Sequence, residues 1–206
     1  MKKIVLALFV LSATMVFGQE NDWKKEKPLD NGSHLLFTAG GGDIVTDGSL
    51  LGLDWGNTFM IYKFNSIDLA LGLETSWIDA SYNSSELTSE DNVHTFLLST
   101  AIGPNATYKI MDKLSAKMHF KFRPTGMLIF DDALSSNDDG YGGDWGIGTT
   151  NSFGLSVRYD VFTLGFEFIS GMLTTTRYVD DILGNEQEIK TDRKLNYSRL
   201  FIGFRF

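Results

Sequence analysis

Large hydrophobic side chains alternate with small or polar ones along most of the chain from residue 34 onward, and this period of two constrains the fold more than any other feature. Successive side chains of a β-strand point to opposite faces, so the alternation predicts strands with one apolar and one polar face. The phase is ambiguous at Gly56 and Asn57, which predicts a β-bulge there. Eight segments carry the pattern: residues 34–42, 50–64, 67–82, 93–110, 114–130, 149–159, 161–178 and 194–206.

The connections between these segments alternate in length. The tight turns are expected at residues 65–66, at 111–113 and around Asp160. The longer, polar connections are residues 43–49, 83–92, 131–148 and 179–193. A tyrosine precedes each tight turn (Tyr62, Tyr108 and Tyr159), as in the aromatic girdle of a membrane barrel. Together these features predict an all-β fold, a closed antiparallel transmembrane up-and-down β-barrel of about eight strands.

The residue types on the polar face indicate which face turns inward. A soluble barrel of the lipocalin kind shows the same alternation with its apolar face inside, so the period alone leaves both arrangements open. Here much of the polar face is small, and small residues suit the narrow interior of an eight-stranded barrel. Examples are Ala70, Gly72, Ser99, Ala101, Gly103, Gly154, Ser156, Gly165 and Gly203. We therefore expect the Leu, Ile and Phe side chains of the other face to meet lipid.

Several ionisable side chains fall on the face assigned to the interior. A buried charge is costly alone and tolerated when paired, so these residues should form an ionic network near mid-barrel. Pairing of the last two strands would bring Glu167 and Arg199 to similar depth. A proton- or ion-conducting relay is the alternative use of such charges. The members are Glu74, Lys117, His119, Lys121, Glu167 and Arg199.

The N-terminus has the pattern of a secretory signal. Lys2 and Lys3 precede an apolar stretch, and Gly18 before Gln19 suits cleavage. We predict a signal peptide over residues 1–18, a flexible periplasmic segment over 19–33 and the barrel over 34–206. The apolar stretch is too short for a membrane-spanning helix. Removing the two lysines lowers the formal charge from −8 to −10, which argues against nucleic acid as a partner.

No catalytic or cofactor-binding set emerges from the sequence. His119 lies between Lys117 and Lys121 on the inner face, while His34 and His94 are expected near interfaces or loops. The loop over residues 131–148 carries five aspartates, Asp131, Asp132, Asp138, Asp139 and Asp144, without the order of an EF-hand. A solvated loop is the simpler interpretation, and weak cation binding stays open.

The last seven residues, Leu200 to Phe206, together with the signal and the alternating turns, resemble small outer-membrane β-barrel proteins of Gram-negative bacteria. Phe17 to Gln19 resembles signals of the Bacteroidetes group. The resemblance implies that a C-terminal apolar stripe is read by the barrel-assembly machinery, and that both termini are periplasmic with the long loops extracellular. The matching residues are Leu200, Ile202, Phe204 and Phe206.

The favoured function is a non-enzymatic integral barrel with a structural or surface-interaction role. Its partners would be outer-membrane lipid and an extracellular ligand bound by the long loops. Two alternatives remain: a membrane-embedded barrel enzyme that modifies lipid or cleaves peptide, and a soluble secreted lipocalin-like barrel that binds a ligand. The physiological ligand and the oligomeric state are left open by the sequence.

Overall fold

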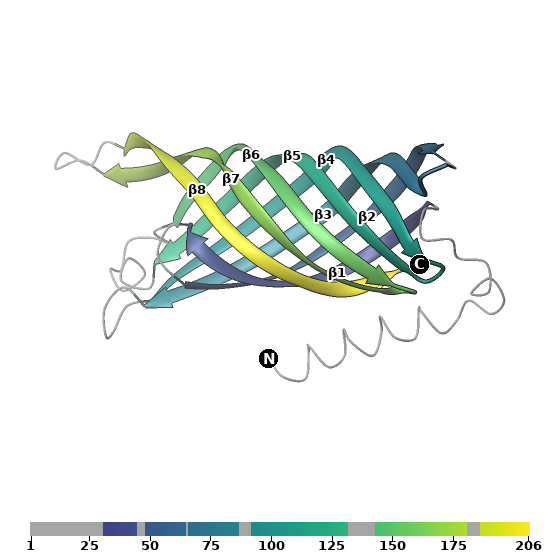
Figure 1. The fold of residues 1–206 in the computed structure, drawn as a ribbon. Helices are drawn as coiled ribbons and strands as arrows, with labels where there is room; N and C mark the ends of the chain where they lie inside the picture. The colour runs from purple at the N-terminus through teal and green to yellow at the C-terminus, as the bar shows by residue number, and fades with distance from the viewer. Residues whose placement is uncertain (1–30, 45–47, 65, 87–91, 132–142, 181–185) are drawn as a thin grey trace.

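The computed structural model describes residues 31–44, 48–64, 66–86, 92–131, 143–180 and 186–206. These residues form eight strands that close into a single ring, each antiparallel to its chain neighbour, with β1 paired to β8 (Figure 1). The predicted all-β, closed antiparallel barrel is confirmed. The strands are β1 (Gly32–Asp43), β2 (Gly48–Phe64), β3 (Leu69–Glu86), β4 (Asn92–Met111), β5 (Leu114–Asp131), β6 (Gly143–Tyr159), β7 (Phe162–Asp180) and β8 (Glu186–Arg205).

Several strand starts differ from the prediction. β3 begins at Leu69 rather than at 67, because Asp68 adopts a left-handed backbone with φ of 49° that ends the turn. β6 begins at 143 rather than 149, and β8 at 186 rather than 194. The β8 extension is polar, which a reading based on hydrophobic alternation assigns to a loop, whereas the β6 extension is rich in glycine and carries Trp145 and Ile147 exposed on its outward face. β1 begins at Gly32, two residues before the predicted barrel start, and the predicted signal peptide lies outside the described residues.

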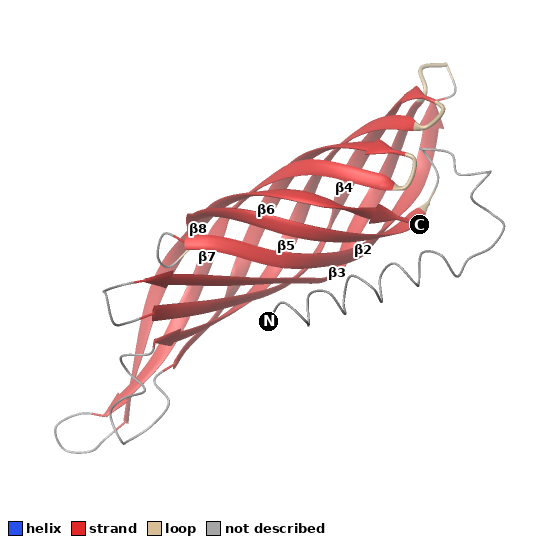
Figure 2. Cartoon of the chain, turned by 90° about the horizontal axis from the view of Figure 1, so that it is seen from below, coloured by secondary structure: helices blue, strands red, loops and turns tan. Residues whose placement is uncertain are grey.

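The ring closes through its last residue. Ser33 donates a backbone hydrogen bond to the Phe206 carbonyl (2.7 Å), and Phe206 donates one to the Ser33 carbonyl (2.9 Å). The β1–β8 register then runs from His34 opposite Arg205 to Asp43 opposite Asn196. Figure 2 shows the same closed tube from below, with every strand inclined to its long axis.

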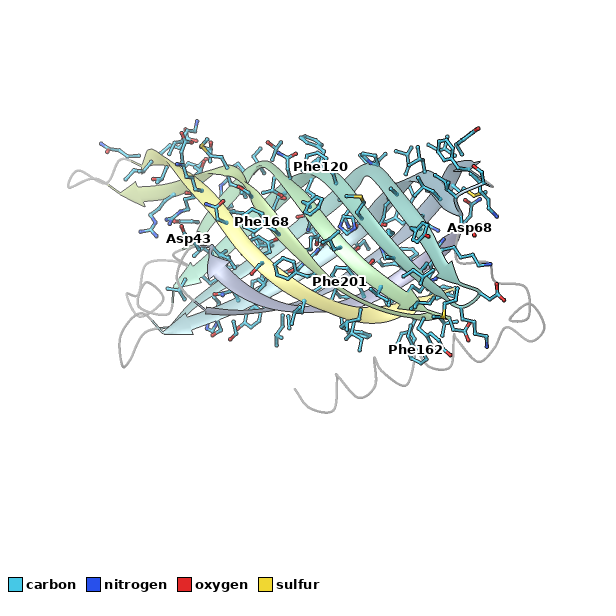
Figure 3. The ribbon with its side chains drawn as sticks, viewed as in Figure 1. Asp43, Asp68, Phe120, Phe162, Phe168 and Phe201 are labelled. Carbon is cyan, nitrogen blue, oxygen red and sulfur yellow. The ribbon has the colours of Figure 1, made fainter. Side chains whose placement is uncertain are left out.

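The distribution of side chains is the inverse of that in a soluble protein. Figure 3 shows Phe201 inside the ring and Phe120 and Phe162 outside it, and their exposed fractions are 4%, 49% and 55%. Large hydrophobic side chains are exposed on strands all around the ring, whereas charged and hydroxyl side chains dominate the buried set. Tyr62, Tyr108 and Tyr159, which precede the short turns, are exposed as well. The polar face of the alternation therefore lines the lumen.

The bulge lies opposite its predicted position rather than at it. Trp77 and Ile78 of β3 are both exposed, and the β3–β4 register jumps between Ser76 and Asp79. Gly56 and Trp55 of β2 face this irregularity across the ladder. The bulge thus belongs to β3, and its extra residue turns Asp79 into the lumen, where Asp79 is 2% exposed.

None of the described residues forms a helix long and apolar enough to cross a membrane.

Candidate functional site

The lumen holds a group of charged side chains that converge from five strands. β5 supplies four basic or imidazole side chains at alternate positions, so all four point inward: Lys117, His119, Lys121 and Arg123. β8 adds Arg199, and the acids come from β2, β3 and β7. The nine residues, here called the lumen cluster, are Asp54, Glu74, Asp79, Lys117, His119, Lys121, Arg123, Glu167 and Arg199.

Glu167 lies at the centre of the lumen cluster. It is opposite Arg199 in the β7–β8 ladder, and Arg199 Nε and Nη2 donate to its Oε2 at 2.8 and 2.6 Å. Its Oε1 lies 3.1 Å from His119 Nε2 and 3.5 Å from Lys121 Nζ. One carboxylate therefore links β5, β7 and β8 across the lumen.

Asp79 is a second node, and sequence reasoning did not include it. Arg199 Nη1 and Nη2 donate to its two oxygens at 2.8 and 2.5 Å, in the paired geometry that suits guanidinium and carboxylate. Arg123 also donates to Asp79 Oδ2. Arg123 was not among the residues expected in the network.

Glu74 and Asp54 complete the acidic side. Glu74 accepts a hydrogen bond from Lys117 and lies 3.6 Å from Lys121 Nζ. Asp54 lies 3.5 Å from Lys121 Nζ and accepts a hydrogen bond of 3.0 Å from Ser76. Lys121 is therefore shared among three carboxylates of three strands.

His34 corrects an expectation. It is 3% exposed, and its Nε2 lies 3.5 Å from Asp54 Oδ1, so it belongs to the lumen rather than to an interface. His94, by contrast, lies toward the long-loop end, where its Nδ1 is 2.7 Å from the Tyr82 hydroxyl.

The lumen cluster is balanced in charge. Four carboxylates face four lysine or arginine groups when the histidine is neutral, and seven of these eight side chains are 1–2% exposed, while Lys117 is 14% exposed at its side chain. Charges this far from water are tolerated only when paired and hydrogen-bonded. All six residues selected from the sequence point into this one space, and the contacts above join them.

Two glycines make room for the larger lumen side chains. A Cβ on Gly154 would lie 2.4 Å from the His119 ring, and one on Gly165 would lie 2.2 Å from the Phe201 ring. The small inner residues of β6 and β7 are thus required by the bulky ones of β5 and β8.

An apolar layer lies between the lumen cluster and the long-loop end. Leu173 and Leu195 are fully buried on β7 and β8, farther toward that end than Glu167 and Arg199. This layer covers the charged groups on the loop side. Its buried members are Ile44, Leu50, Val93, Leu97, Met127, Ile129, Ile169, Leu173, Leu195 and Tyr197.

The loop assigned to residues 131–148 is shorter in the structure. Asp144 lies in β6, buried, and its carboxylate accepts two hydrogen bonds from Arg177 at 2.5 and 3.1 Å. It is a structural partner of β7 rather than a loop ligand. Asp132, Asp138 and Asp139 lie outside the described residues, and the described part of the chain contains no group of His, Asp or Glu arranged to hold a metal ion.

The four C-terminal residues selected from the sequence alternate as expected. Leu200 and Ile202 are 61% and 59% exposed, and Phe206 is exposed at the end of the ring. The Phe204 ring packs against Phe162, with centroids 5.2 Å apart. Together they form an outward apolar stripe on β8.

No family model and no curated protein matches this chain. Among solved structures, Ail of Yersinia pestis in complex with the heparin analogue sucrose octasulfate is similar over 86% of this chain and 99% of its own, with 11% identity and a TM-score of 0.51. Ail alone gives the same coverage and identity with a TM-score of 0.47. A major outer membrane protein of Thermus thermophilus covers 84% of this chain and 99% of its own, with 11% identity and a TM-score of 0.37. The Ail match confirms the eight-stranded barrel fold.

Proposed function

We propose that this protein is an integral outer-membrane β-barrel with a closed, side-chain-filled lumen and a structural or surface-interaction role, without catalysis. The observation that carries the proposal is the inverted distribution of side chains. Large apolar side chains cover the outside of the ring, and charges fill its inside. In water such a surface would far exceed the apolar patch of an ordinary monomer, of about 300–600 Å². A lipocalin-like soluble barrel would bury these side chains instead.

The proposed orientation follows from the two ends of the barrel. The start of β1, the C-terminal Phe206 and the short turns share one end, with Tyr62, Tyr108 and Tyr159 nearby, which is the periplasmic pattern of such barrels. The long connections would then be extracellular. The outward stripe of Leu200, Ile202, Phe204 and Phe206 is our candidate signal for the barrel-assembly machinery, and a Bacteroidetes source remains a prediction.

The lumen cluster supports a plug rather than an active site. The contacts of His119 are to the carboxylates of Glu74 and Glu167, so it is not held by a hydroxyl nucleophile. The apolar layer adds a second barrier on the loop side. These two layers favour a barrel closed to solutes over a channel or a proton relay.

The cationic groups of this chain do not favour binding of a sulfated ligand like that of Ail. A polysulfate calls for available cationic groups. On the described loop end, Arg177 donates to Asp144, Arg193 Nη2 lies 3.6 Å from the same carboxylate, and the exposed Lys190 and Lys194 alternate with Glu188 and Asp192. We therefore propose no sulfated glycan as a ligand.

The test is expression of the full chain with its own signal in a Gram-negative host. We expect it in the outer-membrane fraction, with a mobility on detergent gels that changes when the sample is boiled. Recovery of the chain as a soluble periplasmic protein would overturn the proposal. Recovery in the membrane fraction with a gel mobility that does not change on boiling would overturn it as well.

A further inference from the structure

The β7–β8 hairpin leaves one long strand edge uncovered. β8 pairs with β7 from residue 186 to 204, but with β1 only from Asn196 to Arg205. Residues 186–195 therefore have a strand partner on one side alone among the described residues, and Figure 1 shows the hairpin extending beyond the end of β1. Ten residues give an edge of about 30 Å along the strand. Every second residue directs its N–H and C=O away from β7.

The side chains of this edge carry alternating charge. Glu188, Lys190, Asp192 and Lys194 are exposed on the outward face of β8. Proteins commonly place charges on an edge to prevent pairing with other strands. A pattern that alternates in sign repels only some partners and attracts a strand with the complementary order.

We propose that this edge binds the same edge of a second copy of the chain, in an antiparallel pair centred on Thr191. In that register Glu188 lies opposite Lys194 of the second copy and Lys190 lies opposite its Asp192, and the two-fold symmetry makes each pair twice. Centring on Lys190 would oppose two lysines, and centring on Asp192 would oppose two aspartates. Of the three neighbouring registers, only the one centred on Thr191 pairs all four of these outward charges with their opposites.

The existing contacts of these side chains do not prevent the exchange. Lys190 Nζ lies 3.1 Å from Glu188 Oε1, and Thr174 donates to Asp192 at 2.8 Å. Both contacts are exposed, and exposed pairs contribute little, typically about 0–1 kcal/mol. Pairing of the two edges replaces these contacts with ion pairs between the copies and adds backbone hydrogen bonds between the two β8 strands.

Given the proposed membrane function, on which this step rests, the geometry places the two copies in opposing membranes. An antiparallel pair has its two-fold axis perpendicular to the sheet, and for a barrel wall this direction is radial and lies in the membrane plane. Copies within one membrane are related by axes along the membrane normal. Such an axis cannot make a strand inclined to the normal, as in Figure 2, antiparallel to its copy. The edge therefore fits a homotypic contact between two facing membrane surfaces.

The experiment uses the protein purified from outer membranes and reconstituted in phosphatidylcholine vesicles, whose clustering is followed by light scattering. The wild type should cluster vesicles. Glu188→Lys and Lys194→Glu should each reduce clustering about tenfold, because both place like charges opposite one another. Vesicles of the two variants, when mixed, should cluster again, because the mixed contact restores both opposite-charge pairs. Lys113→Glu, a charge reversal on the short-turn end, is the matched control and should behave as wild type.

The outcomes separate the two proposals. Protein that fails to insert, judged by the absence of a heat-dependent gel shift in the vesicles, refutes the proposed membrane function. Inserted wild-type protein that leaves vesicles dispersed refutes the edge pairing alone. Clustering that survives both charge reversals, or is not restored by mixing them, also refutes it and points to another surface or partner.

Discussion

Replacing Glu167 with glutamine should destabilise the barrel more than almost any other single change of similar size. The side chain is 1% exposed and contacts His119, Lys121, Arg123 and Arg199, so its loss leaves four cations with three carboxylates. Removing one partner of a buried ion pair costs about 3–5 kcal/mol of unfolding free energy. Arg199→Gln should cost a similar amount, because Asp79 and Glu167 each lose two hydrogen bonds donated by the Arg199 guanidinium.

The double change is the informative variant. It restores a balance of three cations and three carboxylates, so the double variant should recover part of the loss, with a coupling energy of about 1–3 kcal/mol. The free energies are measured by urea unfolding of the purified protein in detergent micelles. Glu188→Gln with Lys190→Gln is the control pair, since both residues are exposed and should couple by less than about 1 kcal/mol. Strict additivity at Glu167 and Arg199 would refute the reasoning that the lumen cluster acts as one network.

Three further outcomes are expected. Deleting Phe206, or changing it to Asp, should leave export intact but lower the amount of heat-modifiable barrel in the outer membrane, since the residue ends the outward stripe and bonds Ser33; unchanged amounts would contradict an assembly role. In planar bilayers the purified protein should give no large, stable conductance steps, because charges and an apolar layer fill the lumen; such steps would rule out the closed plug. Gly154→Ala should displace the His119 ring and lower the free energy of unfolding by about 1–3 kcal/mol, as overpacking does. Gly126→Ala, whose Cβ would meet nothing closer than 3.8 Å, should be nearly neutral. Equal effects of the two changes would show that the His119 ring has room to move.

The sequence is informative about this fold because the period of two is visible without knowledge of tertiary contacts. It predicts eight strands, their antiparallel order and which face is small and polar. It also predicts that Glu167 and Arg199 reach similar depth, because consecutive strands pair. The structure places the two residues opposite each other. These inferences depend only on local pattern and on strand order.

The parts that the sequence could not supply are those that depend on irregularities. Asp79 follows the bulge at Trp77 and Ile78, which resets the phase, so strict alternation would place it incorrectly. Asp54 was missed although β2 keeps its alternation there, because the sequence alone left the phase at Gly56 and Asn57 ambiguous; Asp54, Gly56 and Thr58 are all buried. The start of β8 was missed because its polar residues lack the hydrophobic signal, and that of β6 because its glycines and Asp144 resemble a loop. Only the cross-strand partners reveal them.

The origin of the lumen cluster in five different strands has a consequence for how the barrel forms. Glu167 and Arg199 become neighbours only when β8 is in place, and Asp79 meets Arg199 across 120 residues of chain. A partial sheet that enters lipid would therefore carry several uncompensated charges and two open edges, a costly state in hydrocarbon. Insertion of this chain should proceed without stable half-barrels. If the protein acts as the proposed membrane barrel, the charges of the lumen cluster would therefore oppose the entry of an incomplete ring into the bilayer.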